Sequence, residues 1–83
     1  MDKILVSFYV IKLDEEYDMY LPINEKISNV IKNVQNTLIE LSNGAYVYSE
    51  SALLYDGLMG RVINNNNIVK FSGLKNGSRV LLV

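Results

Sequence analysis

The sequence predicts an α+β protein in which one helix packs across one face of a mixed sheet of four to five strands. Two segments near its start alternate apolar and polar residues, as strands do, and one segment in the middle repeats its apolar residues with the helical period. Short apolar runs between turn residues make up the rest. Because a chain of 83 residues can bury only one small core, we expect a single domain over residues 1–83.

The first strand is predicted over residues 4–11 and the second over residues 17–21. In the first strand the alternate residues that we expect to face the core are all apolar: Ile4, Val6, Phe8 and Val10. The second strand follows a polar break at residues 13–16, alternates in the same way, and ends at Pro22, which cannot donate to a strand ladder. The two strands are expected to form a hairpin.

The apolar period then changes to that of a helix of about four turns. The residues that recur at spacings of three and four predict its buried stripe: Ile27, Val30, Ile31, Val34, Leu38 and Leu41. Asn24 is the predicted N-cap, and Asn43-Gly44 is expected to supply the left-handed backbone that ends the helix. Ile39 lies off the stripe, so we expect it either at the edge of the core or exposed.

The remaining strands are predicted to be short. Residues 45–48, which include Tyr46 and Tyr48, fit either a strand or an extended loop, and the apolar runs around Asp56-Gly57 and Gly60 predict a hairpin of strands three and four. The four asparagines at 64–67 form a polar loop whose role the sequence does not show. After it come apolar anchors and a turn at residues 75–78. These anchors are Ile68, Val69 and Phe71.

The composition excludes several classes of function. The chain has no cysteine and no histidine, so thiol and imidazole chemistry, disulfides and zinc sites of the usual kind are absent. We find no nucleophile with a base and no phosphate-binding loop, and we expect no enzyme, no cofactor and no metal site. A net charge of −1 without a basic run disfavours nucleic acid as a partner. The apolar run at the start is too short to span a bilayer, so we expect no membrane insertion and a cytoplasmic location.

Three stretches, together with the order of elements, resemble the ubiquitin-like β-grasp fold. "LPINEKISNVIKNVQ" stands where ubiquitin has the end of its second strand and the start of its helix, "ALLYDGLMGRV" resembles its third and fourth strands, and "NIVKFSGLKNGSRVLLV" resembles its closing segment. The length, the helix start and the glycine-turned ending are similar to the YukD/EsaB family of Gram-positive bacteria, which is associated with type VII (WXG-type) secretion. The resemblance implies that the last strand, residues 79–83, lies in the middle of the sheet beside the first.

The resemblance also implies a function without covalent attachment. Ubiquitin conjugation needs a flexible extension that ends in Gly-Gly, because only glycine lets the backbone thread a narrow enzyme tunnel. This sequence stops at Val83, inside the last predicted strand. We therefore expect a non-conjugated protein-interaction module, by resemblance an accessory or regulatory component of a type VII secretion system.

The predicted binding surface lies on the sheet face that the helix does not cover. If Val80 and Leu82 point inward, Leu81 and Val83 point outward. Leu54 is placed on the same outer face, between an inward Leu53 and Tyr55, and positions that resemble Leu54 and Val83 belong to the apolar patch through which ubiquitin binds partners. Tyr9 and Tyr20 either extend this surface or pack across strands. The expected partner is a protein, in particular a secretion-system component.

The sequence leaves two alternatives open. One is a sulfur carrier or modifier that works through its C-terminus. The other is a structural β-grasp subunit that associates with itself, for example as a homodimer, through the same patch.

Overall fold

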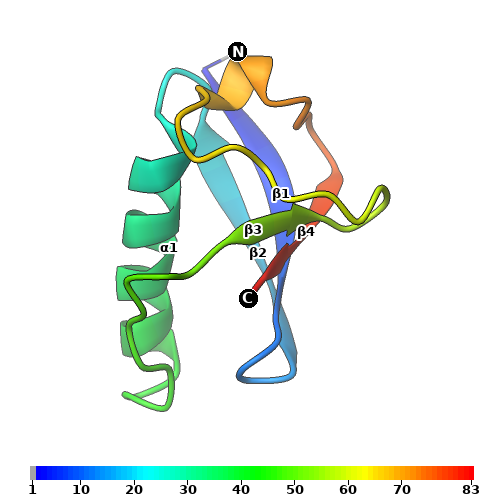
Figure 1. The fold of residues 1–83 in the computed structure, drawn as a ribbon. Helices are drawn as coiled ribbons and strands as arrows, with labels where there is room; N and C mark the ends of the chain where they lie inside the picture. Colours follow the sequence, from blue (N-terminus) through cyan, green and yellow to red (C-terminus); the bar gives the residue numbers. More distant parts are fainter. Residues whose placement is uncertain (1) are drawn as a thin grey trace.

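A computed structural model describes residues 2–83 and has one four-stranded mixed sheet with a single long helix on one of its faces (Figure 1). The elements follow in the order β1 (Lys3–Val10), β2 (Glu15–Pro22), α1 (Ile27–Leu41), β3 (Leu54–Asp56), the 3₁₀-helix η1 (Val69–Phe71) and β4 (Ser78–Leu82). The predicted α+β class is confirmed.

The strands lie side by side in the order β2-β1-β4-β3. β1 pairs antiparallel with β2 and parallel with β4, and β4 pairs antiparallel with β3. Parallel neighbours need a long crossover, and here the whole chain between β1 and β4 provides it. In Figure 1 the red β4 lies between β1 and β3, so the predicted central position of the last strand is confirmed.

The core lies between the sheet and α1. Val6, Phe8 and Val10 of β1 are fully buried, as predicted, and so are Val80 and Leu82 of β4. The helix contributes the following buried apolar residues: Ile27, Val30, Ile31, Val34 and Leu38. Each such side chain contributes about 1.5–3 kcal/mol to stability through the apolar surface that it removes from water.

The buried face of α1 is rotated relative to the prediction. Gln35, expected on the polar side, is 1% exposed, and Ile39 packs at the edge of the core. Leu41, expected in the buried stripe, is 57% exposed. The reason is that the segment after the helix returns along its Gln35 side, where Gln35 bonds to Tyr46 and Ser49. This segment covers the Gln35 side of α1, so the buried face of the helix includes Gln35, and Leu41 lies at the margin of that face.

The helix begins without the cap that the sequence predicted. Lys26, not Asn24, occupies the N-cap position, and its side chain makes no capping bond. The backbone carbonyls of Asn67 and Asn65 accept the N–H groups of Ile27 and Ser28 instead, at 2.8 and 3.0 Å. The asparagine loop therefore satisfies two of the four donors that a helix start leaves without partners.

The end of the helix agrees with the prediction. Asn43 and Gly44 have positive φ values of 53° and 82°, and the Gly44 N–H bonds to the Ile39 carbonyl at 2.8 Å. This is the left-handed termination that an Asn-Gly pair favours.

The segment after the helix contains less strand than predicted. Residues 45–48 form a loop, with Tyr46 buried, and the predicted fourth strand is reduced to one bridge between Tyr55 and Val62. The turn itself is confirmed, because the Asp56 carboxylate accepts the N–H groups of Leu58 and Met59 and closes it with side-chain bonds. Only a short segment on either side of this turn is paired with another strand: β3 has three residues, and the segment after the turn forms the single bridge at Val62.

Two of the predicted anchors after the asparagine loop behave differently. Val69 is fully buried, whereas Phe71 is 69% exposed, so its role as an anchor is not confirmed. Both belong to η1, and a 3₁₀-helix of three residues per turn directs residues two apart to different sides.

Candidate protein-binding face of the sheet

The sheet face opposite α1 carries the side chains that alternate with the core residues, and strand register sets them in rows. Tyr9 of β1 pairs with Leu81 of β4, and Leu81 pairs with Tyr55 of β3. Two residues further along β4, Val83 exchanges two backbone hydrogen bonds with Leu53, at 2.9 and 3.1 Å. We call the residues of these two rows the open-face patch: Tyr9, Leu53, Tyr55, Leu81 and Val83.

The open-face patch is partly accessible and held in place. Val83 is 44% exposed, and the other four residues are half-buried. The hydroxyl of Tyr9 donates to the carboxylate of Asp14 in the β1–β2 turn. Each member is also fixed through its backbone by the strand ladder, so the patch is a preformed surface.

A polar row borders the patch on one side. The Ser7 hydroxyl donates to the Asp18 carboxylate at 2.6 Å, and Ser7 pairs in register with Arg79. Beyond this row lies Tyr20, which is 65% exposed and pairs with Leu5. Tyr20 therefore shares the face with Tyr9 but is separated from the open-face patch by a polar row.

The predicted outward position of Leu54 is wrong. Leu54 is fully buried and pairs with Leu82, which points into the core. Leu53 and Tyr55 take the outer face instead. In the other strands the alternation of apolar and polar residues shows which side chains face the core. Residues 53–55 are all apolar, so their sequence does not show which of them point inward. Ala52, which is 5% exposed and two residues before Leu54, shares its inward phase.

A hollow of about 200 Å³ opens between the open-face patch and the polar row. Tyr9 and Leu81 line its apolar side, and Glu16 and Arg79 bring one charge of each sign. Gly57 also lines it and donates its N–H to the Arg79 carbonyl at 2.9 Å. A Cβ at position 57 would lie 2.9 Å from that oxygen, so only glycine fits without a shift of the backbone.

Over residues 2–83, acidic side chains nowhere gather in a group of three that could hold a metal ion. Within the same range no helix has the length and the apolar character needed to cross a membrane.

Comparison with known proteins identifies the fold by its likeness to solved structures. The sequence matches no protein-family profile and no curated protein. Among solved structures, the ubiquitin-like domain of the type VII secretion system protein EccD1 from Mycobacterium tuberculosis has a TM-score of 0.75 and 14% identity, over 100% of this chain and 99% of that one. The ubiquitin-like domain of EccD5 from Mycobacterium xenopi has a TM-score of 0.73 and 19% identity, over 100% and 94%.

The chain thus has the ubiquitin-like β-grasp fold that the sequence resemblance implied. The same fold also occurs in a chain of the toluene 4-monooxygenase HD complex, with a TM-score of 0.77 and 12% identity over 98% of this chain and 96% of that one. At such identities the likeness establishes the fold alone, and the function has to be argued from the surface.

Proposed function

We propose that the protein is a non-conjugated ubiquitin-like interaction module of the YukD/EsaB type, which acts in the cytoplasm of a Gram-positive bacterium as an accessory or regulatory component of a type VII secretion system. The observation that carries the proposal is the open-face patch, a continuous apolar surface on the side of the sheet away from α1. The similarity to two ubiquitin-like domains of type VII secretion proteins supports the choice of system.

The open-face patch has the chemistry of a protein contact. Leu81 lies between two tyrosines, Tyr9 and Tyr55, and tyrosine is among the residues that contribute most to binding energy at interfaces. Monomeric proteins rarely leave such a patch uncovered without a use. Covering it contributes about 25 cal/mol for each Å² of apolar surface removed from water.

The backbone around Val83 supports docking without covalent chemistry at that residue. Its N–H and C=O both bond to Leu53. Val83 could enter the active site of an activating enzyme only after these two bonds were broken. The alternative of a carrier or modifier is tested by incubating the protein with an adenylating enzyme and ATP and searching for an adenylate by mass spectrometry, and we expect none.

The proposal is tested by purifying tagged protein from the source bacterium and identifying what accompanies it. We expect a component encoded beside this gene in a secretion cluster, and we expect Leu81→Asp to lose it. Asn36→Asp is the matched control, because Asn36 is an exposed residue of α1 and lies away from the patch. Equal recovery with Leu81→Asp, or recovery of proteins unrelated to secretion, contradicts the proposal.

Sedimentation of the same two variants separates docking from self-association. If the parent protein sediments as a dimer and Leu81→Asp sediments as a monomer, the open-face patch serves a second copy of the chain. We expect the parent and both variants to be monomers.

A further inference from the structure

The turn that follows β3 projects from the sheet with an apolar tip. Leu58 is 90% exposed and Met59 is 58% exposed. In Figure 1 this yellow-green turn extends from the side of the molecule opposite α1. Neither side chain belongs to the core, so folding does not account for an apolar residue at either position.

The backbone N–H groups of this tip already have partners within the turn. The Asp56 carboxylate accepts those of Leu58 and Met59, at 2.8 and 3.1 Å, and the Asp56 carbonyl accepts that of Gly60 at 2.8 Å. A loop with unpaired N–H groups is excluded from an apolar medium, because nothing there can bond to them. The tip can therefore leave water with these three donors satisfied.

The charges of the chain are divided between its two parts. Residues 51–83 carry four basic side chains and one acidic side chain, whereas residues 1–50 carry four basic and eight acidic ones. The net charge of −1 hides this division. The single acid of the second part is Asp56, and its carboxylate is engaged in the bonds that close the turn.

Three of the four basic side chains of the second part lie around the apolar tip. A hollow of about 560 Å³ lies between the turn and the segment that leads into β4, and its lining includes Leu58 from the turn and Lys75 and Arg79 from the segment. Arg61 follows the turn, and its carbonyl accepts the Asp56 N–H at 2.8 Å. All three cations are exposed, so the tip has a positive border.

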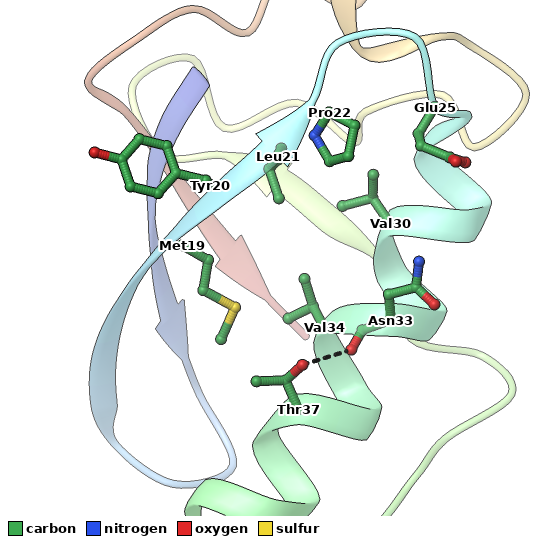
Figure 2. Close-up of a pocket in the computed structure, with 9 residues that line it drawn as sticks. All are labelled: Met19, Tyr20, Leu21, Pro22, Glu25, Val30, Asn33, Val34 and Thr37. Carbon is green, nitrogen blue, oxygen red and sulfur yellow. Dashed lines mark hydrogen bonds between the residues drawn. The ribbon is translucent and has the colours of Figure 1, made fainter. Parts of the chain in front are cut away.

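The opposite edge of the sheet has the reverse charge. β2 carries Glu15, Glu16 and Asp18 and has no lysine or arginine. Beside it, the hollow between β2 and α1 has the carboxylate of Glu25 at one end (Figure 2). An anionic surface would repel this edge and attract the turn, so the division of charge gives the protein one preferred orientation.

We propose that this turn docks the protein on a membrane surface rich in anionic phospholipids. Leu58 and Met59 would enter the boundary between headgroups and acyl chains, and Arg61 and Lys75 would lie among the lipid phosphates. Such a contact is peripheral, and it agrees with the finding that the described part of the chain has no helix able to cross a membrane.

An acidic segment of a protein would match the same charges. The shape and the backbone favour the membrane, because the tip projects from the fold and its N–H groups are satisfied without a partner. A protein would have to offer a pocket shaped for the tip, whereas a lipid surface deforms around it. The turn is separate from the open-face patch, and the test needs only the purified protein, so its result does not depend on the proposed function.

The test is co-sedimentation of the purified protein with sucrose-loaded vesicles. We expect binding to phosphatidylcholine with about 30% phosphatidylglycerol to be at least roughly tenfold stronger than to phosphatidylcholine alone, and most of it to be lost at about 0.5 M salt. Leu58→Ser should weaken binding roughly tenfold, because the tip loses its apolar side chain. Leu41→Ser is the matched control, since Leu41 is also exposed but ends α1, and it should bind as the parent does.

A second pair of variants tests the charge. Lys75→Gln should weaken binding about fivefold, because one cation near the anionic surface is lost. Lys75 is preferred to Arg79 here, because Glu16 lines the neighbouring hollow together with Arg79. Lys32→Gln removes the same charge from an exposed position of α1 and should leave binding unchanged.

A fluorescent dye shows which part of the protein meets the lipid. The chain has no cysteine, so Met59→Cys provides a single attachment point for a dye whose emission depends on polarity. We expect the emission to shift to the blue when anionic vesicles are added. The same dye on Leu41→Cys should show no shift.

Several outcomes would overturn the inference. They are absence of binding to the anionic vesicles, equal binding to neutral and anionic vesicles, equal binding by the parent and Leu58→Ser, and equal dye shifts at the two positions. If the vesicles are not bound but a peptide of glutamates and leucines is, with a loss in Leu58→Ser, the occupant of the turn is an acidic protein segment and the membrane proposal is wrong.

Discussion

The side-chain oxygen of Gln35 accepts a hydrogen bond from the hydroxyl of Tyr46 at 2.7 Å, inside the core. The same oxygen accepts the Ser49 N–H at 2.9 Å, and the Gln35 amide nitrogen donates to the Ser49 carbonyl at 3.1 Å. These three bonds fasten the loop after α1 to the helix. Because the Gln35 amide is satisfied by them, its burial is tolerated at low cost.

Replacing Gln35 by alanine should destabilise the protein by about 2–4 kcal/mol. The substitution leaves the Tyr46 hydroxyl and both backbone groups of Ser49 without partners and opens space beside them. The measurement is the free energy of unfolding in urea. Asn36→Ala, at the neighbouring exposed position, is the control and should change it by less than about 0.5 kcal/mol. Equal effects of the two substitutions would show that the Gln35 bonds do not contribute.

The Tyr46 hydroxyl predicts a loss of stability at alkaline pH. Burial raises the pKa of Tyr46 above its ordinary value of 10.0, and the nearby Tyr48 adds to this. A tyrosine with a raised pKa in the folded state contributes stability that is fully present below pH 10 and is lost as the pH rises through the folded-state pKa. Tyr46→Phe removes this contribution, so its stability should fall less steeply than that of the parent above pH 10.

Some loss of stability at alkaline pH should remain in Tyr46→Phe. Tyr17 donates to the Glu15 carboxylate at 3.0 Å, and this bond raises the pKa of Tyr17 in the same direction. Urea midpoints between about pH 9 and 11 measure both slopes. Identical slopes for the parent and Tyr46→Phe would contradict the assignment. At neutral pH we expect Tyr46→Phe to cost about 1 kcal/mol, because one buried hydrogen bond is lost.

Much of the fold could be predicted because periodicity is strong where one face of an element is buried. Val6, Phe8 and Val10 alternate with less apolar residues, so their inward direction was readable from the sequence. Gln35 was not predicted in the core, because its burial depends on a loop whose path no local pattern encodes. The same loop explains why the buried arc of α1 includes Ile39 and ends before Leu41.

The candidate site was predicted in part. Tyr9, Leu81 and Val83 lie together on the outer face, as β1 and β4 alternation indicated. Leu54 was assigned to the wrong face, because three successive apolar residues leave the phase of β3 undefined. Only its pairing with Leu82 settles the phase, and that contact lies far away in sequence.

The phase of β3 can be tested with a matched pair of truncations. Leu54→Ala should cost about 2–5 kcal/mol, because a fully buried leucine leaves a cavity between the sheet and α1. Leu53→Ala should cost less than half as much, because Leu53 is half-buried on the outer face. Unfolding in urea gives both values. A larger cost for Leu53→Ala would restore the assignment that the sequence suggested.

The asparagine loop should stabilise the protein because the Asn64 side chain holds its turn in place. The Asn64 side-chain oxygen accepts the Asn66 N–H at 2.9 Å, and the Asn67 N–H bonds to the Asn64 carbonyl at 3.1 Å. These bonds hold the turn that presents the carbonyls of Asn65 and Asn67 to the first turn of α1.

Asn64→Ala should therefore cost about 0.5–1.5 kcal/mol and increase amide exchange at Ile27 and Ser28, the donors that the loop caps. Asn66→Ala is the control within the same run, because the Asn66 side chain is exposed and the turn uses only its backbone N–H. It should change stability by less than about 0.5 kcal/mol. Equal costs for the two variants, or unchanged exchange at Ile27 in Asn64→Ala, would mean that the Asn64 side chain does not hold the loop against the helix.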